Sequence, residues 1–235
     1  MQQTGTLYLI PVPLADNALH TLAPEIGVIT RQLSYYFAEN ARTARRFLRV
    51  LHPDLKIEPI IFSEIDKNTG PDIPLLLQWL REGKDIGVLS EAGCPGIADP
   101  GADLVAAAHN AAATVVPLTG PNSLILALMA SGLNGQSFCF NGYLPVKEPE
   151  RSKKIKVLET LSQKENQTQL FIETPYRNNR ILEDLLRNCR DNTLLCVAQN
   201  ITAPDASIRT QRIADWKRQK HSMEKTPTVF LLLAQ

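Results

Sequence analysis

Short apolar runs alternate with amphipathic stretches along the first half of the chain. The apolar, β-prone runs predict buried strands, which in order cover residues 6–10, 32–38, 56–62, 85–89 and 114–118. The stretches between them predict helices at residues 40–51, 73–82 and 101–112. We expect a further helix to begin after Asp16, a good N-cap, and to end at Gly27. This alternation predicts an α/β fold with a mostly parallel sheet covered on both faces.

Thr119-Gly120-Pro121 interrupts this pattern near the middle of the chain. We therefore place a domain boundary there, which gives an N-terminal α/β domain at 1–118 and a C-terminal α/β domain at 119–235. In the second domain the pattern predicts strands at 137–144, 169–173, 194–199 and 228–233, and helices at 121–131, 150–161 and 177–188. The last helix has the clearest apolar stripe.

Composition narrows the class of protein. Apolar residues make up 44% of the 235 residues and the net charge is +1, so the chain can bury a core and its bulk charge requires neither a nucleic acid nor a membrane. No secretory signal is evident, and the longest apolar run, 229–234, is far shorter than the roughly 20 residues of a membrane helix. The four cysteines and four histidines lack metal-site spacing. We expect a cytoplasmic protein with reduced thiols, no metal and no membrane partner.

One Gly- and Pro-rich loop, Ser90–Gly101, follows a predicted strand and precedes a predicted helix. Ligands of open parallel sheets bind beyond the carboxyl ends of the strands, and small residues let the backbone approach them closely. Glu91 and Asp99 add carboxylates that could hold a ribose hydroxyl or a cationic group. An ordinary turn is the alternative interpretation.

Three more segments join a strand to a helix with polar side chains. Leu118–Ser123 could offer free amides to an anion or simply cap a helix. Glu39 and Arg42 could serve proton transfer and substrate binding, or form a solvated i, i+3 pair. Phe171–Arg180 places Glu173 at a strand end before two arginines, again with a capped helix as the alternative. Basic residues gather at 153–156 and 209–225, which weakly favours an RNA-facing surface.

The order of these segments resembles one family. In one-letter code they include SEAGCPGIADPG at Ser90–Gly101, VVPLTGPNS at Val115–Ser123 and ETPYR at Glu173–Arg177, with further matches at Gly5–Leu14, Ala130–Leu133 and Phe140–Pro145. Together they are similar to the RsmI-type bacterial family of ribosomal small-subunit RNA 2′-O-ribose methyltransferases, within the tetrapyrrole methylase superfamily.

The resemblance implies two α/β domains, each a mixed or parallel sheet flanked by helices, with S-adenosylmethionine folded into the cleft between them. It also implies a homodimer and ribosomal RNA as partner. The cofactor-binding residues that it implies lie in both domains. They are Ser90, Ala92, Gly93, Cys94, Ile97, Ala98, Asn122, Ser123, Ile172, Glu173, Asn200 and Ile201.

The chain departs from the family pattern at several motifs. The family's E-D-T-R is Glu39–Arg42 here, with Asn40 in place of the aspartate, and its D-A-G-T-P is Glu91–Pro95. Its P-I-G-N-L turn is Pro13–Asn17, and its K-G-E segment before the last strand is Lys225–Pro227. These departures bear on the substrate more than on the fold.

Methyl transfer by in-line attack of a ribose hydroxyl needs alignment and benefits from a base. Glu39 and Glu91 are the candidate bases, and Arg42 could place a phosphate. Two other functions stay open: methylation of a tetrapyrrole (corrin or porphyrin) carbon, and a cofactor-binding regulatory protein without catalysis.

Overall fold

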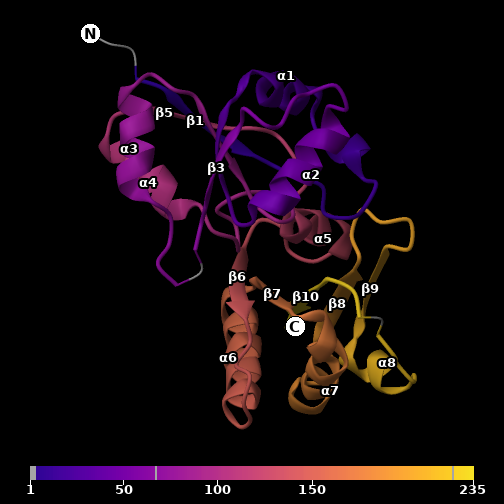
Figure 1. Ribbon diagram of the computed structural model, residues 1–235. Coiled ribbons are helices and arrows are strands. Elements are labelled where there is room, and N and C mark those ends of the chain that lie inside the picture. The colour runs from indigo at the N-terminus through magenta and orange to yellow at the C-terminus, as the bar shows by residue number, and fades with distance from the viewer. Residues whose placement is uncertain (1–3, 67, 224) are drawn as a thin grey trace. The chain divides into compact units, whose positions relative to one another are not determined.

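The chain folds into two compact units. The computed structural model describes residues 4–66, 68–223 and 225–235. It divides into Met1–Asn122 (unit 1) and Ser123–Gln235 (unit 2). Each unit holds a five-stranded sheet flanked by helices (Figure 1), which confirms the α/β class expected from the sequence.

The sheet of unit 1 is entirely parallel. Its strands are β1 (Thr6–Ile10), β2 (Tyr35–Ala38), β3 (Ile61–Glu64), β4 (Ile86–Leu89) and β5 (Thr114–Pro117). Their order across the sheet is β3-β2-β4-β1-β5. All five carboxyl ends therefore meet at one edge, and the loops that leave them are neighbours.

Helices cover both faces of this sheet. They are α1 (Pro24–Gln32), α2 (Ala41–Leu51), α3 (Ile73–Arg81) and α4 (Ala102–Asn110), which follow the strands in alternation (Figure 1). On one face Tyr36 packs with apolar residues of α1 and α2, and on the other Phe37 packs with those of α3 and α4. The near-continuous apolar strands in the sequence follow from this burial on both faces.

The sheet of unit 2 is mixed. Its strands are β6 (Phe138–Tyr143), β7 (Thr168–Glu173), β8 (Leu194–Gln199), β9 (Ser207–Arg212) and β10 (Thr228–Leu233). Their order is β6-β7-β10-β8-β9, and only the pair β6–β7 is parallel. The central strand β10 is buried along its whole length.

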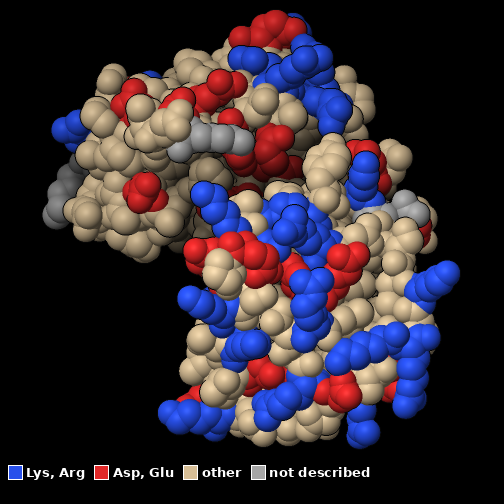
Figure 2. All heavy atoms as spheres, turned by 90° about the horizontal axis from the view of Figure 1, so that it is seen from below, with Lys and Arg blue, Asp and Glu red and all other residues tan. Residues whose placement is uncertain are grey.

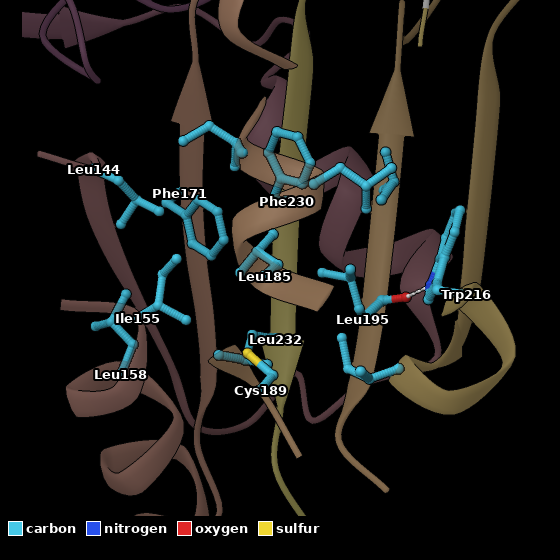
Figure 3. Packing of buried hydrophobic residues seen from close by; sticks show 14 of the residues in the cluster. Leu144, Ile155, Leu158, Phe171, Leu185, Cys189, Leu195, Trp216, Phe230 and Leu232 are labelled. Atoms are coloured by element: carbon cyan, nitrogen blue, oxygen red, sulfur yellow. Dashed lines mark hydrogen bonds between the residues drawn. The ribbon is translucent and has the colours of Figure 1, made fainter. Parts of the chain in front are cut away.

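The faces of this second sheet pack against different helices. One face contacts α5 (Ser123–Ser131) through residues such as Leu128. The other packs against α6 (Glu150–Glu165), α7 (Asn178–Asn188) and α8 (Ile213–Lys217). Figure 3 shows this second core: Phe171 and Phe230 stack at 5.5 Å between ring centroids, and Trp216 donates its indole N–H to the Leu195 carbonyl.

Three predictions for secondary structure are wrong in detail. The strand expected at 56–62 lies instead at Ile61–Glu64. The helix expected from Asp16 to Gly27 begins instead at Pro24 and passes through Gly27, because proline is suited to the first turn and a single glycine is tolerated inside a helix. Strand β9 and helix α8 were not predicted, because β9 is polar on both faces and lies at the edge of its sheet. Within the described residues, no helix is long and apolar enough to cross a membrane.

A buried ion pair joins two helices of unit 2. Arg151 of α6 is 1% exposed, and its guanidinium bonds Asp184 of α7, with Nη2 2.6 Å and Nε 2.7 Å from Oδ2. The same guanidinium donates to the Val146 carbonyl and to Glu148. All its polar hydrogens are thus turned toward acceptors, which is the condition under which a buried charge is tolerated.

Asp184→Ala removes the buried carboxylate from that guanidinium and leaves it only the more exposed Glu148. We expect the free energy of unfolding to fall by about 3 kcal/mol, measured by urea denaturation. The matched control is Asp191→Ala, whose carboxylate is exposed and pairs with Lys217; it should change stability by less than about 1 kcal/mol. Equal losses in the two variants would contradict this account of the pair.

Candidate active site

The loop after β4 is bonded to the loop after β1 by main-chain contacts. Val12 N–H donates to the Gly93 carbonyl at 2.9 Å, and Gly93 N–H donates to the Val12 carbonyl at 3.1 Å. Gly93 has a φ of +75°, and a Cβ there would lie 3.0 Å from Leu14 Cδ2. The backbone angle therefore favours glycine at this position, and a larger residue would also have to displace the end of the Leu14 side chain.

The loop after β5 joins the same cluster. A Cβ on Gly120 would overlap the ring of Pro11, so the main chain of one loop packs directly against the proline ring of the other. The Cys94 thiol donates to the Pro121 carbonyl at 3.4 Å. Three loops, from β1, β4 and β5, are thus held together at the carboxyl edge of the sheet.

The remainder of the β4 loop folds on itself. Ser90 Oγ donates to the Gly93 carbonyl at 3.3 Å, and Ile97 N–H donates to the Cys94 carbonyl at 3.3 Å. Ala98 has a φ of +60°, unusual for a residue with a side chain. The Ile97 side chain is 48% exposed. An exposed aliphatic side chain on a constrained loop provides an apolar contact for a ligand, as binding sites commonly do.

The carboxylates of Glu39 and Glu91 are close enough to that of Asp99 to act on it through their charges. Burial, together with the charges of Glu39 and Glu91, raises the pKa of Asp99 to about 6. Glu91 accepts a hydrogen bond from Thr43 Oγ1 at 2.5 Å, so α2 helps to place it. The group is rich in negative charge and suits a cationic ligand. No cluster of His, Cys, Asp or Glu suited to a metal ion occurs in the described part of the chain.

The Cys94 thiol is half-buried and has a raised pKa. Burial raises its pKa, and the charge of Asp99 acts in the same sense, while a hydrogen bond with the Asn122 side chain opposes them. The thiol therefore stays protonated at neutral pH and acts here as a small packing group and donor.

The N-terminus of α2 lies beside Glu39. Asn40 is the N-cap, and its Oδ1 accepts from the N–H groups of Arg42 at 2.9 Å and Thr43 at 3.3 Å. Glu64, at the end of β3, accepts from Ala41 N–H at 2.8 Å. The Arg42 side chain is exposed, so a phosphate can reach it.

In unit 2 the predicted residue Glu173 ends β7 and is 4% exposed. Its carboxylate accepts from the Arg177 guanidinium and from Thr174 N–H at 2.7 Å. Arg177 also donates to the Leu144 carbonyl at 3.3 Å. This pair fixes the turn after β7, with Ile172 packed at the edge of the core beside it.

The other predicted residues of unit 2 follow β8 or begin α5. Asn200 has a φ of +49°, and its side chain donates to Asp205 at 2.5 Å. Ile201 packs at the edge of the α5 core, and Ser123 is the first residue of α5. Thr202 Oγ1, in the same turn, is buried without a hydrogen-bond partner in the described structure. A polar group of a ligand would satisfy it.

Within unit 1 the structure brings the predicted residues together at one edge. One loop holds Ser90, Glu91, Ala92, Gly93, Cys94, Ile97 and Ala98, and Asn122 adjoins it. The sequence named Asp99 and Glu91 together as carboxylates of this loop, but it did not place Asp99 near Glu39. Nothing in the sequence singled out Thr43.

The chain has clear relatives among known proteins. Residues 28–216 match the family model of Tetrapyrrole (Corrin/Porphyrin) Methylases. Curated proteins named "Ribosomal RNA small subunit methyltransferase I" match from Escherichia coli O157:H7 (29% identity, 97% of this chain, 77% of that protein) and Streptococcus pyogenes serotype M3 (34%, 83% and 65%). The Bacillus subtilis relative is 32% identical over 74% of this chain and 56% of its own. The chain thus spans between about half and four-fifths of these relatives.

Two solved structures share the fold. The methyltransferase CobJ superposes with a TM-score of 0.63 at 19% identity, covering 98% of this chain and 95% of that one. A uroporphyrin-III-C-methyltransferase from Thermus thermophilus gives 0.53 at 16% identity, with 97% and 92% covered. With the matched family model extending over most of both units and their sheets, the chain belongs to the tetrapyrrole (corrin/porphyrin) methylase family.

Proposed function

We propose that the protein is an S-adenosylmethionine-dependent methyltransferase that acts on a ribose 2′-hydroxyl of small-subunit ribosomal RNA. One observation carries the proposal. The loops that follow β1, β4 and β5 form a fixed backbone cradle beside a group of carboxylates, and the relatives that match through this stretch are named as small-subunit rRNA methyltransferases.

The cradle suits the methyl donor in charge. S-adenosylmethionine supplies a methyl group from a sulfonium, which leaves as a neutral thioether. Gly93 and Gly120 let the loops pack closely on one another, which holds the β4 loop in a fixed position. Glu39, Glu91 and Asp99 provide negative charge for the sulfonium, the amino group or ribose hydroxyls. The unit 2 residues implied for the donor, including Glu173 and Asn200, stay a prediction.

The chain's own groups have separate tasks in the proposed reaction. As the new O–C bond forms and the S–C bond breaks, the attacking hydroxyl loses its proton, and Glu39 or Glu91 accepts it. Thr43 holds Glu91 in place through its 2.5 Å hydrogen bond. Arg42, exposed at the start of α2, binds a phosphate of the acceptor strand.

The charge of the two units supports an RNA acceptor only in part. Unit 2 has 16 Lys and Arg against 11 Asp and Glu, whereas unit 1 has 9 against 13. Figure 2 shows the basic side chains standing apart, with acidic ones among them, instead of forming one continuous patch. Defined contacts must therefore supply much of the affinity for RNA. A cytoplasmic location, expected from the sequence composition, and a homodimer, implied by the family resemblance, complete the proposal.

Calorimetric titration tests the donor. We expect micromolar binding of S-adenosylmethionine and of its demethylated product, and bound donor should slow alkylation of Cys94 several-fold because the thiol lies on the cradle. Cys139, on β6, is the internal control and should react at an unchanged rate. Absence of heat with both compounds would refute donor binding.

Acidification should weaken the preference for the charged donor. With a pKa of about 6, Asp99 is ionised at pH 7.5 and mostly protonated at pH 5.0. Because only the donor carries the sulfonium charge, the ratio of product Kd to donor Kd should fall several-fold across this range. In Asp99→Asn the ratio should vary little with pH. Asp103→Asn, four residues along on α4, should behave as wild type. A constant ratio in the wild-type protein would disprove the role of Asp99.

Loss of the base should slow methyl transfer without loss of the donor. With radiolabelled donor and small ribosomal subunits or their RNA, we expect Glu39→Gln or Glu91→Gln to lower kcat by about 10²–10⁴-fold at similar donor Kd. Glu58→Gln, outside the cradle, is the control. Full rates in both Glu39→Gln and Glu91→Gln would reject the assignment. Transfer to a porphyrin precursor, but not to RNA, would reject the substrate.

A further inference from the structure

Unit 2 contains a cavity of about 190 Å³ that shares no residue with the predicted donor site. It lies on the α7–α8 side of the sheet, where β8 and β9 meet the loop after α8. Its lining is Leu182, Val197, Gln199, Ser207, Arg209, Trp216, Lys220, His221, Ser222 and Met223. Four of these also belong to the core of this face: Leu182, Val197, Trp216 and Met223.

The cavity wall is held in place by hydrogen bonds. Asn179 of α7 accepts from Met223 N–H at 2.8 Å and donates to the Met223 carbonyl at 3.2 Å, so one side chain pins the loop. His221 Nε2 lies 2.6 Å from the Trp216 carbonyl. Trp216 itself is fixed by its bond to Leu195, visible in Figure 3. The cavity therefore exists before a ligand binds, which lowers the cost of binding.

The lining combines cationic side chains with an aromatic ring, which are groups that bind nucleotides. The Arg209 guanidinium lies over the Trp216 ring, 5.4 Å from its centroid, and is oriented by Gln219 Oε1 at 2.8 Å. Lys220 and His221 add two groups able to bind a phosphate. None of the described residues that line the cavity is acidic. A flat guanidinium, a nearby imidazole and a lysine together offer a stacking plane for a base and a cation for its phosphate.

We propose that this cavity binds one unpaired nucleotide of the RNA substrate, with its base on the outer face of Arg209 and its phosphate on Lys220. A volume of about 190 Å³ is below that of a drug-sized ligand and admits a single base or phosphate group. Proteins recognise single-stranded RNA through bases that are unstacked from their neighbours. A uniformly basic patch would bind only the phosphates and would not distinguish one base from another. The proposal rests on RNA as the substrate class and makes the cavity an anchoring site that shares no residue with the predicted donor site.

Affinity for a fluorescently labelled single-stranded fragment of small-subunit rRNA provides the test. We expect Arg209→Gln to weaken binding about 10-fold. Lys220→Gln should reduce the slope of log affinity against log salt by about 0.7, the value for one phosphate contact on a single strand. The matched control is Arg212→Gln: Arg212 lies on the same strand but, three residues from Arg209, points to the opposite face. It should bind as wild type.

A local reporter shows whether RNA enters the cavity. The chain has two tryptophans, so Trp79→Phe leaves Trp216 as the sole emitter. In this background, once its unfolding temperature is shown to be close to wild type, RNA should quench Trp216 emission, and Arg209→Gln should abolish the quenching. RNA binding with wild-type affinity in the Arg209 and Lys220 variants would overturn the proposal. Quenching by inorganic phosphate or free mononucleotides, but not by RNA, would overturn it in favour of a small anionic ligand.

The test of the cavity site and the test of the proposed methyltransferase function can fail independently. Donor titration and methyl transfer are measured on the same variants. Methylated RNA with no effect of Arg209→Gln on RNA affinity would refute the cavity site alone. An effect of Arg209→Gln on RNA affinity in a protein that never methylates RNA would support the cavity site and refute the function.

Discussion

The close packing of three loops is the constraint on which the candidate site depends. Val12 and Gly93 exchange hydrogen bonds, and Gly120 lies against Pro11 with no room for a Cβ. These contacts are possible only because β4, β1 and β5 are adjacent and parallel, so that their carboxyl ends leave the sheet together. The loop of β4 is thereby fixed at its start, while Ile97 remains exposed at its tip.

Electrostatics at this edge follows from the same arrangement. Glu39 ends the strand next to β4, and Glu91 and Asp99 lie within the β4 loop, so sheet order alone brings three carboxylates into range of one another. The repulsion among them, together with burial, is what keeps the pKa of Asp99 near 6. Such a site loses much of its own repulsion when a cation binds, which gives a physical reason for it to prefer a sulfonium over a neutral thioether.

The departures from the family motifs are conservative in structural terms. Asn40, in place of an aspartate, still caps α2 through its side-chain oxygen, because asparagine and aspartate are equally good N-caps. The substitution removes one negative charge from the edge where Glu39, Glu91 and Asp99 already repel. Cys94, in place of a threonine, still donates to the Pro121 carbonyl. The cap of α2 and the hydrogen bond to Pro121 are thus both present, while the edge carries one negative charge fewer than the family motif would give it.

The sequence by itself determined the α/β class, four of the five strands of unit 1 and the loop that forms the cradle, because strands buried on both faces and Gly- and Pro-rich turns leave strong local signals. It also supported the family assignment, since the motifs keep their order along the chain. Only the tertiary structure decided that Asp99 joins Glu39 and Glu91, that Thr43 bonds Glu91, and that β9 and α8 form one wall of a cavity. These features arise from contacts between segments far apart in the chain, and β9 is a polar edge strand whose pattern resembles that of a loop. Periodicity reports which face of an element is buried, but not which partner lies across from it.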